Sequence, residues 1–194
     1  KADEFFTEHP KRYTIGEVEL GVNYVLIIST NAGLWAYNIG DTIQFTSLKP
    51  YRVIVSGRIK HYISAFGEHV IGKEVESALK EAMEGTDVRV NEFTVAPQIT
   101  PTEGLPYHEW FIEFENEPTN IEDFALKIDA AMRKQNVYYE DLIVGNVLRT
   151  LVITKVPKNG FQEYMKSIGK LGGQNKLPRL SNDRKIAQFF EIKE

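Results

Sequence analysis

Three stretches of the sequence set polar or basic side chains beside glycines, a combination suited to binding ribose and phosphate oxygens. The first is residues 37–41 (YNIGD), where we expect a strand to end and Gly40 to allow a turn that presents Asp41. A carboxylate in that position can accept hydrogen bonds from both hydroxyls of a ribose. Because Gly-Asp is also one of the commonest turn pairs, a plain surface turn is the competing interpretation.

The second stretch is residues 56–79 (SGRIKHYISAFGEHVIGKEVESAL), which leads from a strand into an amphipathic helix. Arg58 offers a rigid set of donors that suits ribose or phosphate oxygens, and Lys60 follows two residues later. Taken singly, both are typical surface charges. Their order ahead of Gly67 and Glu68 is more specific than any dipeptide.

The third stretch is residues 169–180 (GKLGGQNKLPRL). Gly172 and Gly173 would let the backbone approach a ligand, and Lys176 would supply a mobile positive charge. Six basic residues stand against one acid over residues 166–185, for which a solvated surface is the competing interpretation. The stretch lacks the GxxxxGK[ST] pattern of a P-loop.

The elements that must position these stretches are a β-rich segment followed by a compact domain. Roughly the first 55 residues have strand-like runs and no helical period, so a sheet with little cover is expected there. From residue 59 the expected order is helix, two strands, two helices, strand, helix, loop and helix. Thr119 is the predicted cap of the second helix, and Ser181 or Asn182 that of the last. The predicted fold class is α+β, with helices over a small, mainly antiparallel sheet.

Composition limits the class of protein further. The chain has 194 residues, 42% of them hydrophobic and 26% charged, which is typical of a soluble globular protein. Its net charge of −4 argues against a general nucleic-acid binder, and its lack of cysteine excludes disulfides and thiolate metal sites. No apolar run is long enough for a bilayer and no signal peptide is visible, so we expect a cytoplasmic protein. Since there is no initiator methionine, we also expect a fragment of a longer chain.

The histidines do not indicate a metal site. His9, His61, His69 and His108 are scattered along the sequence, and surface or packing roles are expected for them. We therefore predict no metal bound by the protein's own side chains.

Together, the order of the three stretches resembles the adenylate-forming superfamily, whose members activate carboxylates with ATP. Residues 33–45 (GLWAYNIGDTIQF) resemble the G-L-Y-R-Y-R-x-G-D core of the auxin-responsive Gretchen Hagen family of acyl acid amido synthetases. Residues 172–184 (GGQNKLPRLSNDR) resemble that family's Q-x-K-x-P-R terminus. The second stretch is most similar to bacterial members. Ala36 and Asn38 replace the two arginines of the plant core.

The resemblance implies a role for several residues. Asp41 would bind the ribose hydroxyls of ATP with Tyr37 nearby, and Arg58 would lie near the ribose and phosphates. Lys60 falls at the superfamily's hinge position, about which the small domain turns between adenylation and transfer.

The same resemblance implies a catalytic lysine in the third stretch. Lys176 would reach the α-phosphate and the acyl carboxylate, and Gln174, Pro178 and Arg179 fit the family pattern around it. Lys170 is the second candidate, because SIGK resembles the superfamily's serine-glycine-lysine ending.

The implied domain division is an incomplete large ATP-binding domain at residues 1–58 and a small mobile C-terminal domain at 59–194. The implied reaction joins a carboxylic acid to an amine at the expense of ATP, with Mg²⁺ held mainly by the phosphates. Transfer to a thiol such as coenzyme A is one alternative, and a non-catalytic anion-binding module is another. The expected partners are small molecules and the missing N-terminal domain, not nucleic acid or membrane, and the 194-residue chain alone should be inactive.

Overall fold

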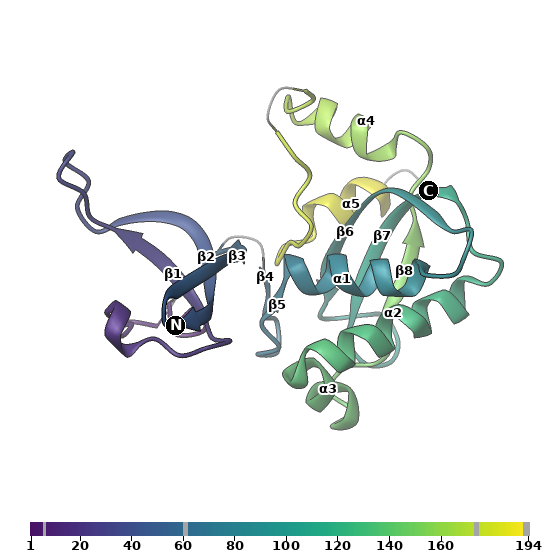
Figure 1. The fold of residues 1–194 in the computed structure, drawn as a ribbon. Coiled ribbons are helices and arrows are strands. Elements are labelled where there is room, and N and C mark those ends of the chain that lie inside the picture. Colours follow the sequence, from purple (N-terminus) through teal and green to yellow (C-terminus); the bar gives the residue numbers. More distant parts are fainter. Residues whose placement is uncertain (6, 60–61, 173–174, 192–194) are drawn as a thin grey trace. The chain divides into compact units, whose positions relative to one another are not determined.

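The computed structural model describes residues 1–5, 7–59, 62–172 and 175–191. The chain forms two compact units, Lys1–Tyr62 with Ile71–Lys73, and Ile63–Val70 with Glu74–Glu194. Each unit has its own sheet (Figure 1). Each also has its own cluster of buried hydrophobic side chains.

The first unit is a three-stranded antiparallel sheet in the order β1-β2-β3. Tyr24, Ile43 and Phe45 form its core, and the rings of Tyr24 and Phe45 meet edge to face. Val53 and Val55 of the edge strand remain 50% and 67% exposed, so the sheet is only partly covered. The elements are η1 (Ile15–Glu17), β1 (Asn23–Ile28), β2 (Tyr37–Leu48) and β3 (Tyr51–Arg58).

One prediction for this unit was wrong. Residues 37–41 do not end a strand in a turn, because they begin β2, the central strand. Strand β1 pairs with the beginning of the stretch, where Tyr37 lies opposite Ile28, and β3 pairs with its end, where Asp41 lies opposite Arg58. Pairing on two sides therefore keeps this glycine-containing stretch in the sheet, and the chain reversal comes before Tyr37 instead.

The second unit has the predicted α+β fold. Its sheet has the order β6-β7-β8, with β6 and β7 antiparallel and β8 parallel to β7. The parallel pair follows from the two helices between β7 and β8, since parallel neighbours need a crossover connection. The remaining elements of the chain are β4 (Tyr62–Ile63), β5 (Val70–Ile71), α1 (Gly72–Met83), β6 (Arg89–Gln98), β7 (Tyr107–Asn116), α2 (Ile121–Gln135), α3 (Val137–Val144), β8 (Val152–Lys155), α4 (Gly160–Ser167) and α5 (Lys185–Glu191).

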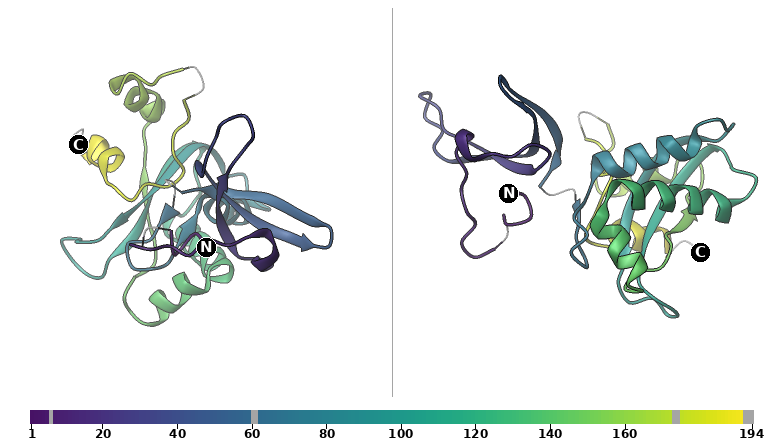
Figure 2. Two further views of the ribbon diagram at one scale, coloured as in Figure 1. Left: turned by 90° about the vertical axis from the view of Figure 1, so that its left-hand side faces the viewer. Right: turned by 60° about the horizontal axis from the view of Figure 1, so that its bottom comes forward.

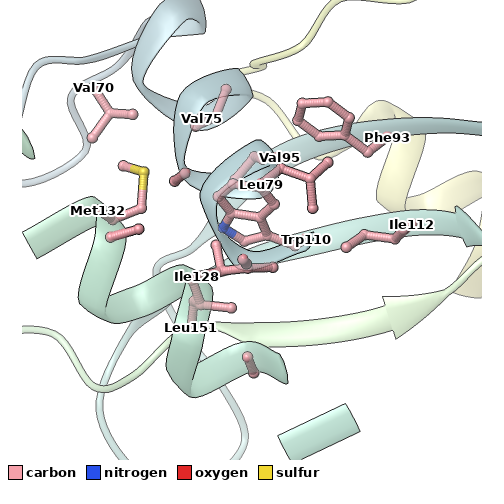
Figure 3. Packing of buried hydrophobic residues seen from close by; sticks show 14 of the residues in the cluster. Val70, Val75, Leu79, Phe93, Val95, Trp110, Ile112, Ile128, Met132 and Leu151 are labelled. Atoms are coloured by element: carbon pink, nitrogen blue, oxygen red, sulfur yellow. The ribbon is translucent and has the colours of Figure 1, made fainter. Parts of the chain in front are cut away.

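Helices cover both faces of this sheet, and the central strand β7 is buried on both sides. Trp110 and Ile112 belong to the core formed with α1 and α2, whereas Phe111 belongs to the core formed with α4 and α5. Alternate side chains of a strand point to opposite faces, so one apolar run serves both cores. Figure 2 shows α1 and α2 side by side over one face. Figure 3 shows the packing beneath them, including Val75, Leu79, Val95, Trp110, Ile128 and Met132.

Two helix starts differ from the sequence prediction. The cap of α2 is Asn120 rather than Thr119, because the Asn120 side chain accepts from the backbone N–H groups of Glu122 and Asp123 at 2.8 and 3.2 Å. Helix α5 begins at Lys185, beyond both predicted caps, and Asp183 Oδ1 accepts from the Lys185 N–H at 3.1 Å. In each case a side chain close to the predicted cap accepts from a backbone N–H at the start of the helix.

Candidate functional site

The residues predicted to bind the nucleotide lie on the paired strands β2 and β3. Asp41 lies directly opposite Arg58 in the ladder, so the structure brings these two residues to adjacent backbone positions. Tyr37 lies four residues earlier on β2, opposite Ile28 of β1, and is 51% exposed. Directly opposite residues in an antiparallel pair have Cβ atoms about 4.5–5.5 Å apart, close enough for two side chains to bind one ligand.

Asp41 lies within an irregular part of β2. Val25 lies opposite Thr42, whereas Ile27 lies opposite Asn38, so two steps along β1 correspond to four along β2. The additional residues lie between Asn38 and Thr42, so Asp41 belongs to the part of β2 where the regular ladder with β1 is interrupted. Bulges of this kind redirect side chains and are common beside functional sites.

The bulge is held by hydrogen bonds around Gly40. The Gly40 N–H donates to Asn38 Oδ1 at 2.8 Å, and the Gly40 carbonyl accepts from the Ile59 N–H at 2.9 Å. Gly40 has a φ of +85°, a conformation that side chains with a Cβ rarely adopt. Asn38, which stands where the plant pattern has an arginine, therefore has a local structural role in shaping the backbone before Asp41.

A buried pair of hydroxyls joins β2 and β3 beside Asp41 and Arg58. The Ser56 hydroxyl donates to Thr42 Oγ1 at 3.1 Å, and both residues are at most 4% exposed. The register between β2 and β3 shifts at the same place, since Thr42 lies opposite Gly57 and the next residue pairs one position further along. This irregularity sets the register that places Arg58 opposite Asp41.

Lys60, the predicted hinge residue, and His61 lie outside the described residues. The Gly67-Glu68 pair of the same motif is described, and its carboxylate is fully buried. Glu68 accepts from the N–H groups of Phe66 and Ala65 at 2.8 and 3.3 Å, and from His108 Nε2 at 2.9 Å. Burial favours the neutral acid, but the hydrogen bond and charge of His108 and the backbone donors outweigh it and lower the pKa of Glu68.

Sequence reasoning missed this pair, although packing was one of the two roles expected for His108. The pair belongs to a wider buried network. Asn136 Nδ2 donates to the Glu68 carbonyl at 2.9 Å, and the ring of Tyr139 lies 5.2 Å from that of His108. The Tyr139 hydroxyl donates to Asp129 at 2.6 Å. No local spacing connects these residues, so only the spatial arrangement of the second unit reveals them.

Lys170, the second candidate lysine, belongs to the end of α4. Its N–H donates to the Met165 carbonyl at 2.8 Å, and the Gly169 N–H donates to the Lys166 carbonyl at 3.0 Å. With Gly169 at a φ of +68°, this is the Schellman arrangement that closes a helix. Helix termination therefore accounts for the glycine-lysine pair, and the Lys170 side chain is exposed.

Lys176 lies at the other end of the loop, next to a segment fixed to the sheet. Leu177 and Leu180 are 8% and 0% exposed, and Leu180 forms a parallel bridge with Val95 of β6. The Lys176 side chain itself is exposed. The third stretch thus places its two lysines differently, one after a helix and one beside the sheet.

The loop between the two lysines contains a glycine in the left-handed region. Gly172 has a φ of +87°, and a Cβ added there would meet no other atom within 4 Å. Asn175 Nδ2 donates to the Gly172 carbonyl at 3.3 Å. Gly173 and Gln174 lie outside the described residues.

Two other features are not found in the described part of the chain. Within residues 1–5, 7–59, 62–172 and 175–191, no group of three or more His, Asp or Glu side chains is arranged to hold a metal ion. Over the same ranges, no helix has both the length and the apolar character needed to cross a membrane.

Comparison with known proteins gives two family matches in sequence order. Residues 1–58 match the GH3 family central domain and residues 73–185 match the GH3 family C-terminal domain. Two relatives from Arabidopsis thaliana are the indole-3-acetic acid-amido synthetases GH3.3 and GH3.6. They are 27% and 25% identical over 202 residues each, covering 95% and 91% of this chain but 33% and 32% of the relatives. The chain therefore spans about a third of these plant proteins, and its similarity to bacterial members stays a prediction.

Solved structures show the same fold. The GH3.15 acyl acid amido synthetase aligns with a TM-score of 0.69 and 19% identity, over 93% of this chain and 35% of that one. A 2-hydroxyisobutyryl-CoA ligase in its postadenylation state aligns with a TM-score of 0.52 and 15% identity, over 91% of this chain and 35% of that one.

Proposed function

The chain belongs to the GH3 family, and we propose that it is part of an ATP-dependent acyl acid amido synthetase. Such an enzyme adenylates a carboxylic acid and then transfers the acyl group to an amine such as an amino acid. The observation that carries the proposal is the ordered match to both the central and the C-terminal domain of the family. The names of the curated relatives support amide formation, and a cytoplasmic location stays a prediction.

The proposed reaction has two steps. A carboxylate oxygen attacks the α-phosphorus of ATP, and the bond to pyrophosphate breaks, with Mg²⁺ accompanying the phosphates. The amine nitrogen then attacks the carbonyl of the acyl-adenylate, AMP leaves with the bonding electrons, and the amine loses a proton. The first step brings two anions together, so its barrier depends on a correctly placed cation.

The proposed nucleotide contacts are made by the first unit. Asp41 accepts hydrogen bonds from the ribose hydroxyls, and Arg58, opposite it in the ladder, binds ribose or phosphate oxygens. Tyr37 borders the same site. Lys60 acts as the hinge between an ATP-binding domain ending at residue 58 and a mobile domain beginning at 59.

The proposed catalytic cation is Lys176 rather than Lys170. The glycine before Lys170 is accounted for by closure of α4, so its likeness to a serine-glycine-lysine ending needs no catalytic explanation. Lys176 precedes a segment held to β6 through Leu180, which gives its side chain a fixed starting point. A flexible ammonium on a fixed base suits an interaction that forms only at the α-phosphate.

The test is carboxylate-dependent ATP–pyrophosphate exchange in the intact protein. Lys176→Ala should lower the exchange rate by about 10²–10³-fold, the usual effect of losing one group that stabilises transition-state charge. Lys170→Ala is the matched control, one exposed lysine of the same loop, and should change the rate by less than about threefold. If Lys176→Ala exchanges at the normal rate, Lys176 is not the catalytic lysine.

Two further measurements separate the alternatives. Product analysis with amino acids and with thiols distinguishes amide formation from thioester formation. A protein that binds an anionic ligand but neither binds nor exchanges ATP would instead be a binding module.

A further inference from the structure

The segment of residues 177–181, which follows Lys176 directly, is attached to the edge of β6. The Val95 N–H donates to the Arg179 carbonyl at 3.0 Å, and the Ser181 N–H donates to the Val95 carbonyl at 2.9 Å. The Thr94 hydroxyl adds a bond of 2.7 Å to the Pro178 carbonyl. Three hydrogen bonds within five residues give this segment the register of a short additional strand.

The Arg179 side chain ties the same segment to two different elements. Its Nε donates to Glu76 Oε1 of α1 at 3.1 Å. Its Nη1 donates to the carboxylate of Glu92 on β6 and to the Phe93 carbonyl, the latter at 3.2 Å. One guanidinium therefore bridges a helix and a strand, which a lysine with its single ammonium reproduces poorly.

The guanidinium also packs against a rigid aromatic surface. Arg179 Cζ lies 4.7 Å from the centroid of the Phe93 ring, and Phe93 is stacked on Trp110 with centroids 5.7 Å apart and planes 7° from parallel. Trp110 is completely buried and Phe93 is 5% exposed. The contact fixes the guanidinium relative to the core of the unit, since neither ring has room to move.

We propose that Arg179 is a positioning residue that holds the backbone at Lys176 in register for its role at the α-phosphate. Arg179 is the third residue after Lys176, and it lies in the segment of residues 177–181 that its side chain fastens to α1 and β6. The inference rests on the proposed function of Lys176. A displacement of about 1 Å of a catalytic group can cost about 10²-fold in rate, so a fixed base matters for a long, flexible side chain.

The structural arm of the test uses the 194-residue chain itself. Arg179→Gln should accelerate hydrogen exchange of the Val95 and Ser181 amides by about tenfold or more, because their bonds form the attachment. Arg133→Gln is the matched control, since Arg133 is 38% exposed against 34% for Arg179 and also bridges to a carboxylate, Glu140. It should leave both amides unchanged. Equal exchange in the two variants would overturn the proposed attachment.

The functional arm uses the intact protein and ATP–pyrophosphate exchange. Arg179→Gln should lower kcat by about tenfold or more with little change in KM for ATP, Arg179→Lys should restore part of the loss, and Arg133→Gln should retain normal exchange. Combining Arg179→Gln with Lys176→Ala should reduce the rate no further than Lys176→Ala alone, because residues that act as a unit are not additive.

The two possible failures are distinguishable. Normal exchange in Lys176→Ala overturns the proposed role of Lys176 and with it that of Arg179. A large loss in Lys176→Ala, together with normal exchange in Arg179→Gln or with multiplying effects in the double variant, overturns only the positioning role.

Discussion

Removing the Glu68 carboxylate should destabilise the second unit more than any surface substitution. The side chains of Glu68 and His108 are 0% and 1% exposed, and their atoms lie 2.9 Å apart. Glu68→Ala leaves the His108 Nε2–H and the Phe66 N–H without an acceptor in the interior. Breaking a buried pair from one side costs about 3–5 kcal/mol, and we expect a loss in that range.

Glu68→Gln separates charge from shape. The amide keeps an acceptor oxygen but loses the negative charge, so the expected loss at pH 7 is about 1–2 kcal/mol, the difference between a charged and a neutral hydrogen bond. The lowered pKa of Glu68 gives this difference a pH dependence. Below the ordinary value of 4.5 the unfolded chain binds a proton that the folded chain does not. The stabilisation by Glu68 is therefore present above that value and is lost as the pH falls through the lowered pKa.

Urea unfolding followed by tryptophan fluorescence is the measurement. Trp110 is fully buried in the second unit, whereas Trp35 of the first unit is 85% exposed and can be replaced by phenylalanine to leave one reporter. Glu117→Ala is the control, since Glu117 is 56% exposed in its pair with Lys155, and it should cost less than about 1 kcal/mol. A Glu68→Ala loss below about 1 kcal/mol, or a Glu68→Gln effect equal at pH 7 and pH 4, would refute the reasoning.

Two more substitutions test the described contacts. Asn38→Ala removes the acceptor of the Gly40 N–H and should destabilise the first unit by about 1 kcal/mol in urea unfolding, whereas Asn38→Asp, which keeps an acceptor, should cost less. Tyr139→Phe removes the 2.6 Å bond to Asp129, which then retains the Leu151 N–H, and should cost about 1.5–3 kcal/mol. Burial, and then the charge of Asp129, raise the pKa of Tyr139 well above 10, so the stability it contributes is complete below pH 10 and is lost as the pH rises further. The phenylalanine variant should lack this alkaline loss.

Local patterns in the sequence predicted the helices well. Val75, Ala78, Leu79 and Ala82 recur at helical spacing and all four are buried on one face of α1. The spacing suffices because a helix buries one stripe whatever it packs against. From α1 onward the predicted order of elements is confirmed, whereas the two-residue strands β4 and β5 ahead of α1 were not predicted, because they are too short to show a strand period.

Predictions that depended on distant partners were less reliable. The apparent turn at residues 37–41 is part of a central strand because β1 and β3 pair with it from both sides, and a glycine gives no sign of that. Glu68 and His108 are 40 residues apart, and neither has a local pattern that marks it as buried. Burying a charge is costly unless tertiary structure supplies a partner for it. Local sequence patterns therefore do not predict a buried pair of this kind.

The two lysines of the third stretch show how much of the candidate site the sequence does contain. Each lysine is followed directly by a leucine, but the two leucines differ in exposure: Leu171 is 55% exposed and Leu177 is 8% exposed. Leu177 is followed three residues later by the completely buried Leu180. Buried leucines on the C-terminal side of Lys176 therefore fix the backbone from which its side chain extends. Lys170 is followed instead by the exposed Leu171 and by Gly172. The choice between the lysines therefore depends less on the basic residues than on the leucines after them.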